Sequence, residues 1–137
     1  MTTHKPSKGL HITLWICQIV LAAMFLMAGF MKLTTPIDKL SETIPWAKDV
    51  SAALVRFIGA SELLGALGLV LPALLRVKTW LTPLAAVGIA LIMIFAIVFH
   101  VLRGEMSATG FNVIIMVLAL FVAWGRYGKA PIRAKKA

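Results

Sequence analysis

The chain is poor in the residues that small proteins use for redox and metal sites. Cys17 is the single cysteine among 137 residues, so an intrachain disulfide, a Cys-x-x-Cys pair and a cysteine zinc cluster are excluded. His4 and His11 lie near the start of the chain, far from His100, which argues against a haem held by two histidines of one chain. No spacing matches a metal cluster, a nucleotide-binding loop or a nucleophile elbow. We therefore expect no metal site.

Acidic residues are also scarce. Five Asp and Glu residues stand against fourteen Lys and Arg residues, and the net charge is +9. Such an excess can indicate nucleic-acid binding, but most of these cations flank long apolar runs, where loop charge determines membrane topology. We therefore expect no nucleic-acid partner.

Apolar residues, in contrast, make up 61% of the chain, against roughly 45–50% in soluble domains. Four apolar runs are each long enough to cross a bilayer as a helix, which takes about 20 residues. They cover residues 11–33, 51–71, 80–102 and 109–125, and Pro72 is expected to end the second. The sequence thus predicts a single transmembrane domain, residues 1–137, in the lipid bilayer. Its fold class is all-α: an antiparallel four-helix transmembrane bundle.

The longest connection, residues 35–50, is expected to hold a short interfacial segment in the first outer loop. Ile37, Leu40 and Ile44 share one side of a short helix, which Pro45 would end, and Trp46 would anchor the segment at the interface. Because the pattern is short, a solvated loop remains the alternative.

The distribution of charge predicts the orientation. An even number of spans places both termini on one side of the membrane. That side holds nine cations and no acid: Lys5, Lys8, Arg76, Lys78, Arg126, Lys129, Arg133, Lys135 and Lys136. The other side holds five cations together with Asp38, Glu42, Asp49 and Glu105. The positive-inside rule then predicts that both termini are cytoplasmic.

Polar side chains gather in the outer half of the predicted spans. Glu62 lies in the middle of an apolar run, where a charge costs roughly 2.5–3.5 kcal/mol, so a pairing or functional role is the default. Lys32, Arg56, His100 and Asn112 lie toward the same side. Arg56 precedes Glu62 by six residues and points about 120° away from its helix face, so Lys32 or His100 is the better partner. The alternative is ordinary solvation at helix ends for Lys32, His100 and Asn112, and outward snorkelling for Arg56.

Small and polar residues also mark faces where helices would pack. Gln18, Gly29 and Lys32 share one face of the first span, and Gly59 and Gly65 flank Glu62 on the second. Small residues allow helices to approach closely in a membrane, and a buried Gln forms hydrogen bonds between them.

Several stretches resemble the DoxX-like family of small bacterial membrane proteins. They are Ala28–Leu33 (AGFMKL), Phe57–Leu69 (FIGASELLGALGL), Pro83–Ala86, His100, Asn112 and Trp124–Arg126. The resemblance implies a four-helix bundle in the bacterial inner (plasma) membrane. Some members are associated with redox systems, including quinone-linked ones, and Lys32, Glu62, His100 and Asn112 match the polar pattern of the family.

Three functions remain open from the sequence. The first is a redox-linked membrane subunit that binds a quinone or another small lipophilic ligand at the polar cluster, with Glu62, Lys32, His100, Asn112 and Arg56 as candidates for ligand binding or proton exchange. The second is a non-enzymatic assembly module that binds another membrane protein or a second copy of the chain. The third is a small proton-coupled transporter, although the charge bias and the place of Glu62 in the second helix weaken it. No catalytic residue can be named.

Overall fold

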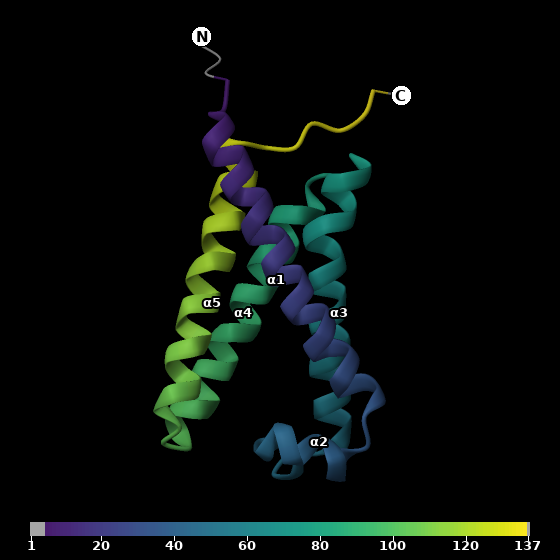
Figure 1. Ribbon diagram of the computed structural model, residues 1–137, viewed down its shortest axis with the longest axis vertical. Helices are drawn as coiled ribbons and strands as arrows, with labels where there is room; N and C mark the ends of the chain where they lie inside the picture. The colour runs from purple at the N-terminus through teal and green to yellow at the C-terminus, as the bar shows by residue number, and fades with distance from the viewer. Residues whose placement is uncertain (1–4, 137) are drawn as a thin grey trace.

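The computed structural model describes residues 5–136, and within them every regular element of secondary structure is a helix (Figure 1). Its elements are α1 (Lys8–Thr34), α2 (Ile37–Thr43), the 3-10 helix η1 (Pro45–Lys48), α3 (Ala52–Leu75), α4 (Leu81–Leu102), α5 (Met106–Trp124) and the π-helical turn η2 (Gly125–Lys129). Four of the helices in this part of the chain are long and apolar enough to cross a membrane. They alternate in direction, so the predicted all-α four-helix bundle is confirmed. We call its two ends the terminal end and the α2 end.

Local sequence explains where the long helices begin and end. Ser7 and Ser51 cap α1 and α3, their hydroxyls accepting from the backbone N–H groups of Leu10 and Leu54. Helix α3 does not end at Pro72 as expected, but continues to Leu75. A proline removes only the bond from its own nitrogen, and so near a C-terminus it leaves the bonds of the last turn intact.

The bundle consists of two helix pairs, α1 with α3 and α4 with α5, which meet near the terminal end and diverge toward the α2 end (Figure 1). Glycines bring α1 and α3 into backbone contact. A Cβ atom on Gly29 would lie 2.6 Å from the carbonyl oxygen of Gly59, closer than such atoms can approach. Gly68 brings α3 similarly close to Ala85 of α4. The small residues thus set the helix separation, as predicted.

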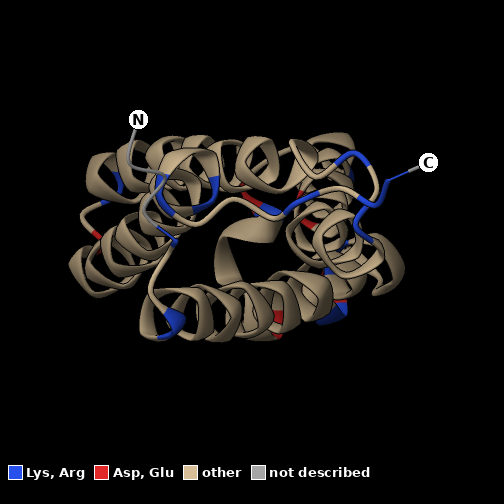
Figure 2. Ribbon diagram, turned by 90° about the horizontal axis from the view of Figure 1, so that it is seen from above, with Lys and Arg blue, Asp and Glu red and all other residues tan. Residues whose placement is uncertain are grey.

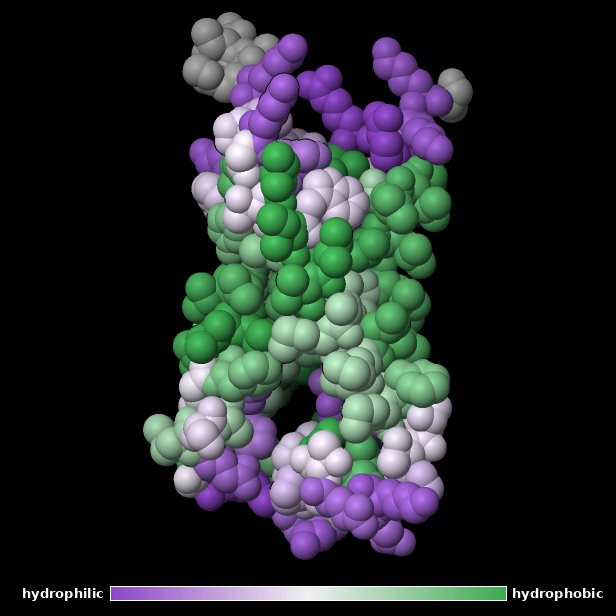
Figure 3. All heavy atoms as spheres, in the orientation of Figure 1, coloured by the Kyte–Doolittle hydropathy of each residue, from purple (hydrophilic) through white to green (hydrophobic). Residues whose placement is uncertain are grey.

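The surface has the pattern of a membrane protein. A hydrophobic band crosses the middle of the visible face, and hydrophilic residues lie at both ends (Figure 3). At the terminal end, the C-terminal tail brings its cations across the bundle (Figure 2). The tail is held at the α3–α4 turn, where Arg76 Nε donates to the Arg133 carbonyl at 2.9 Å and the Lys135 N–H donates to the Arg76 carbonyl at 2.8 Å.

The predicted loop segment forms a small core of its own at the α2 end. Leu40 is 1% exposed and packs with Ala47 and Val55, and Ile44 and Trp46 are partly buried against them. The apolar side of α2 and η1 therefore faces the bundle, and this segment covers the space between the diverging helix pairs (Figure 1).

Candidate functional site

A buried ion pair joins α1 to α3. Lys32 Nζ donates to both carboxylate oxygens of Glu62, at 2.8 and 3.1 Å, and the two residues are 6% and 5% exposed. Glu62 thus has one of the two partners that the sequence favoured. A charged side chain in hydrocarbon needs such a partner, because lipid offers it none.

A glycine of α3 allows α1 to approach closely enough for the ion pair to form. A Cβ atom on Gly59 would lie 2.7 Å from the Cβ of Lys32, so the backbone of α1 at Lys32 rests against α3 one turn before Glu62. This close approach lets the long lysine side chain lie along α3 and reach the carboxylate. Larger residues at position 59 would separate the helices at the pair.

Arg56 binds the main chain of Lys32 rather than its side chain. Its Nη1 donates to the backbone carbonyls of Lys32, at 2.5 Å, and of Thr35, at 2.8 Å. The last carbonyls of a helix lack partners within the helix and carry partial negative charge, so a cation there is favourable. Arg56 therefore binds the C-terminus of α1 and is not paired with Glu62, in accord with its position on a different helix face.

A cavity of about 440 Å³ lies beside the ion pair, at the level where the helix pairs diverge. Its lining is mostly apolar and comes chiefly from α3 and α4. Four of the polar residues predicted from sequence line it from four different helices: Lys32, Glu62, His100 and Asn112. All four are at most 9% exposed. The space-filling view shows the hollow with hydrophilic atoms inside it (Figure 3).

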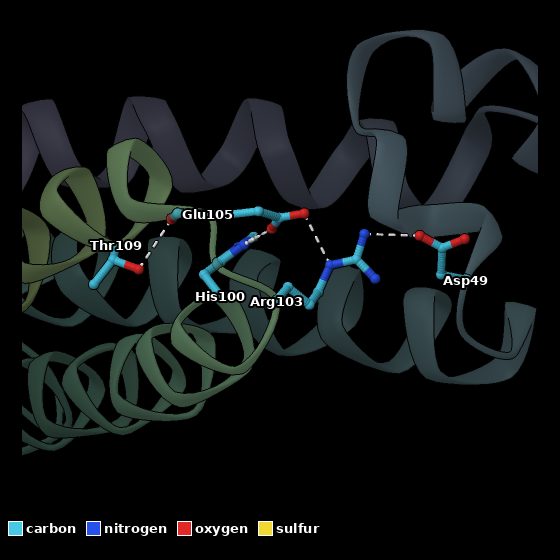
Figure 4. A network of polar contacts seen from close by, with 5 residues as sticks. All are labelled: Asp49, His100, Arg103, Glu105 and Thr109. Atoms are coloured by element: carbon cyan, nitrogen blue, oxygen red, sulfur yellow. Dashed lines mark hydrogen bonds and ion pairs between the residues drawn. The ribbon is translucent and has the colours of Figure 1, made fainter.

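His100 is engaged with a residue that the sequence did not single out. Its Nδ1 lies 2.5 Å from Glu105 Oε2, and the other oxygen of Glu105 accepts from Arg103 Nε at 2.9 Å. Arg103 Nη2 also donates to Asp49 Oδ2 at 2.8 Å, and Thr109 Oγ1 donates to the Glu105 carbonyl at 3.1 Å (Figure 4). We call Asp49, His100, Arg103 and Glu105 the latch, because they connect the α2–η1 segment to the α4–α5 turn.

The ionisation of the latch follows from these contacts. Hydrogen bonds from His100 and Arg103 lower the pKa of Glu105, and hydrogen bonds to Glu105 and Asp49 raise the pKa of Arg103. Both residues are therefore charged at neutral pH. Asp49 is 54 residues from Arg103 in the chain, and no local sequence pattern could have paired them.

A second polar cluster lies at the terminal end, around Arg126. Although the sequence suggested only a topology-setting cation, Arg126 is 2% exposed and donates to the Gln18 side chain at 2.6 Å and to the Ala130 carbonyl at 2.8 Å. Its Nη1 also lies 3.0 Å from His11 Nδ1, which must accept because a guanidinium has only donors. Gln18 in turn donates to the Leu69 carbonyl at 2.7 Å, the interhelical role expected of it.

Within residues 5–136 no three His, Cys, Asp or Glu side chains are grouped as metal ligands would be. The arrangement is instead that of a binding cavity: apolar walls, an ion pair of zero net charge, and the amide and imidazole of Asn112 and His100. A carboxamide both donates and accepts hydrogen bonds. Of the predicted site residues, Arg56 alone does not line the cavity.

These features define a small multi-pass membrane protein with a four-helix bundle and, near one end, a mostly apolar cavity that four buried polar side chains line. The model of the DoxX-like family matches residues 16–122, most of the chain, and the protein belongs to that family. No curated protein and no solved structure matches the chain.

Proposed function

We propose that this DoxX-like protein binds a quinone, or another small lipophilic ligand with a hydrogen-bonding head, in the cavity between its helix pairs, and that it serves as a redox-linked subunit of the bacterial inner membrane. One observation carries the proposal: Lys32, Glu62, His100 and Asn112 line the same mostly apolar cavity. Cavities of roughly 300–1,000 Å³ with few polar groups are typical of small-molecule sites.

Each polar residue has a specific task in this proposal. The ammonium group of Lys32 donates two of its three hydrogens to Glu62, and the third can be donated to a carbonyl oxygen of the ligand. The carboxamide of Asn112 supplies a donor and an acceptor on the opposite helix pair. Glu62, at 5% exposed, is the candidate for proton exchange with a bound head group.

The proposal includes an orientation. The nine cations of the terminal end favour the cytoplasmic side, so the cavity and the latch belong to the outer half of the membrane. A ligand bound there would be reached from the outer leaflet.

A second function has its own support. The Lys32–Glu62 pair is bonded directly across the contact of Gly29 with Gly59, as a device that pairs α1 with α3 would be. In this alternative the protein is a non-enzymatic module that holds another membrane protein or a second copy of itself.

Quinone binding separates the two functions. Trp46 lines the cavity, so a bound quinone should quench its fluorescence, and a Trp46→Phe variant supplies the background from the other tryptophans. We expect decylubiquinone to quench the purified protein in lipid nanodiscs saturably, and Asn112→Leu to weaken binding at least fivefold. Exposed Phe111, the neighbour of Asn112, supplies the matched control Phe111→Leu. If titration never saturates, or if Asn112→Leu binds as the wild type does, the ligand-binding proposal fails and the assembly module is favoured.

A further inference from the structure

The cavity extends from its buried polar side to the outer surface between α3 and α4. Three of the apolar residues that line it are also substantially exposed: Leu54 at 44%, Phe57 at 69% and Phe95 at 67%. Four of its polar residues, Lys32, Glu62, His100 and Asn112, are in contrast buried. The exposed part of the lining, which includes Phe57 and Phe95, is therefore mainly apolar, and most of the polar groups of the cavity lie inside.

This opening lies at the depth of the lipid chains. Phe95 precedes the last residue of α4, Leu102, by seven residues, and Phe57 follows the first residue of α3, Ala52, by five. At 1.5 Å per residue they lie about 8–10 Å inside the helix ends. A hydrocarbon core about 30 Å thick, crossed by helices of this length, contains both side chains.

Toward the α2 end, in contrast, the cavity is covered. The ring of Trp46 packs edge-on against that of Phe99, 5.7 Å between centroids, and both residues line the cavity. Arg103 lies over the Phe99 ring at 5.2 Å and connects Asp49 to Glu105. An aromatic contact and the latch thus separate the cavity from water at this end.

We propose that the cavity is filled sideways from the bilayer, between α3 and α4, by an uncharged amphiphile whose head binds beside Asn112 and Lys32 and whose hydrocarbon chain leaves between Phe57 and Phe95. The proposal rests on the ligand-binding function above and specifies the class of ligand and its route. The head is uncharged because Lys32 and Glu62 already neutralise each other, and a further buried charge would lack a partner. The chain remains in lipid because about 440 Å³ holds a head group but no long chain.

The route can be tested by placing a bulky group at the opening. In a Cys17→Ser background, Phe95→Cys would be labelled with N-cyclohexylmaleimide, a bulky group that does not absorb tryptophan emission, and Leu91→Cys would be the matched control. Leu91 lies one turn earlier on α4, is 52% exposed, and does not line the cavity. Binding of decylubiquinone is read from the quenching of Trp46, as above.

We expect the label on the Phe95→Cys variant to weaken decylubiquinone binding at least tenfold or to slow association by as much, and the label on the Leu91→Cys variant to change neither by more than twofold. Arg103→Gln, which breaks the latch, should leave the association rate of decylubiquinone unchanged, because the ligand does not pass that end. Equal binding by the two labelled variants would overturn the lateral route, and so would faster association in Arg103→Gln. Absence of saturable binding to the unlabelled protein would instead remove the ligand-binding function itself, and the route with it.

Discussion

Arg56 donates to the backbone carbonyl of Lys32, the same residue whose side chain holds Glu62. Two residues of α3 therefore fix one residue of α1, one through its main chain and the other through its ammonium group. This double attachment sets the end of α1 against α3 and orients the lysine along the cavity.

Removing either member of the Lys32–Glu62 ion pair should lower the stability of the protein more than removing both. Removing one partner of a buried pair leaves an uncompensated charge and costs about 3–5 kcal/mol, whereas apolar replacement of both is often close to neutral. We expect Lys32→Met and Glu62→Leu each to lower thermal stability in detergent strongly, and the double variant to recover most of the loss. Additive losses would show that the residues do not act as a pair.

Glu62→Gln separates the structural role of this residue from proton exchange. The amide preserves the shape of the side chain and an acceptor for Lys32, but it cannot exchange a proton at physiological pH. We expect the variant to express and insert, and to fail to complement a deletion strain. Full complementation by Glu62→Leu would remove Glu62 from the site.

The close contact between α1 and α3 predicts that replacing glycine by alanine lowers stability at Gly29, which lies in the contact, but not at Gly88, which lies outside it. Gly29→Ala places a Cβ atom against the backbone of Gly59 and should cost about 1–3 kcal/mol, as overpacking does. Gly88→Ala meets nothing within 4 Å and should be neutral or slightly stabilising, because alanine is the better helix former. Comparison of the two melting temperatures in detergent checks this. Equal melting temperatures would contradict the close contact.

The latch should weaken at low pH, because Glu105 holds the Arg103 side chain that reaches Asp49. The pKa of Glu105 is lowered in the folded protein, so its contribution to stability is present above its ordinary value of 4.5 and is lost as the pH falls through the lowered pKa. With the other tryptophans replaced by phenylalanine, iodide should quench Trp46 weakly near neutral pH and progressively more below about pH 4.5. Arg103→Gln should be quenched more strongly already at neutral pH. If this variant resembles the parent, the latch does not cover the cavity.

Reporter fusions test the proposed orientation. A fusion after Lys136 should report the cytoplasm, and one between Asp38 and Asp49 the opposite side, because the nine cations of the terminal end resist translocation. Equal signals from both positions would exclude this topology.

The predictable parts of this molecule were those that depend on depth and periodicity. The four helices follow from apolar length, and the convergence of Lys32, Glu62, His100 and Asn112 on one cavity follows from their common depth. The sequence narrowed the partner of Glu62 to two residues, Lys32 and His100, but could not choose between them. The structure pairs Glu62 with Lys32, and His100 with Glu105.

Two features of the structure could not be predicted from the sequence, because each depends on how distant segments pack. The contact of Arg103 with Asp49 depends on how the η1 segment folds over the bundle, which no local pattern determines. The burial of Arg126 depends on η2, whose π-helical turn follows the last regular turn of α5. Trp124-Gly125-Arg126 is one of the stretches that resemble the DoxX-like family, but nothing in it indicates that this arginine is buried while the cations after it are exposed.

The separation of Lys32 from Glu62 by 30 residues has a consequence for synthesis. When α1 emerges from the ribosome, its lysine has no acid to meet, and a lone cation in the last turn of a nascent span must stay solvated at the interface and cannot be buried. The carboxylate that neutralises it arrives only with α3. We expect the insertion machinery to retain α1 until α3 has been made, so that the first two spans are released into lipid together, as a hairpin whose charges are already joined.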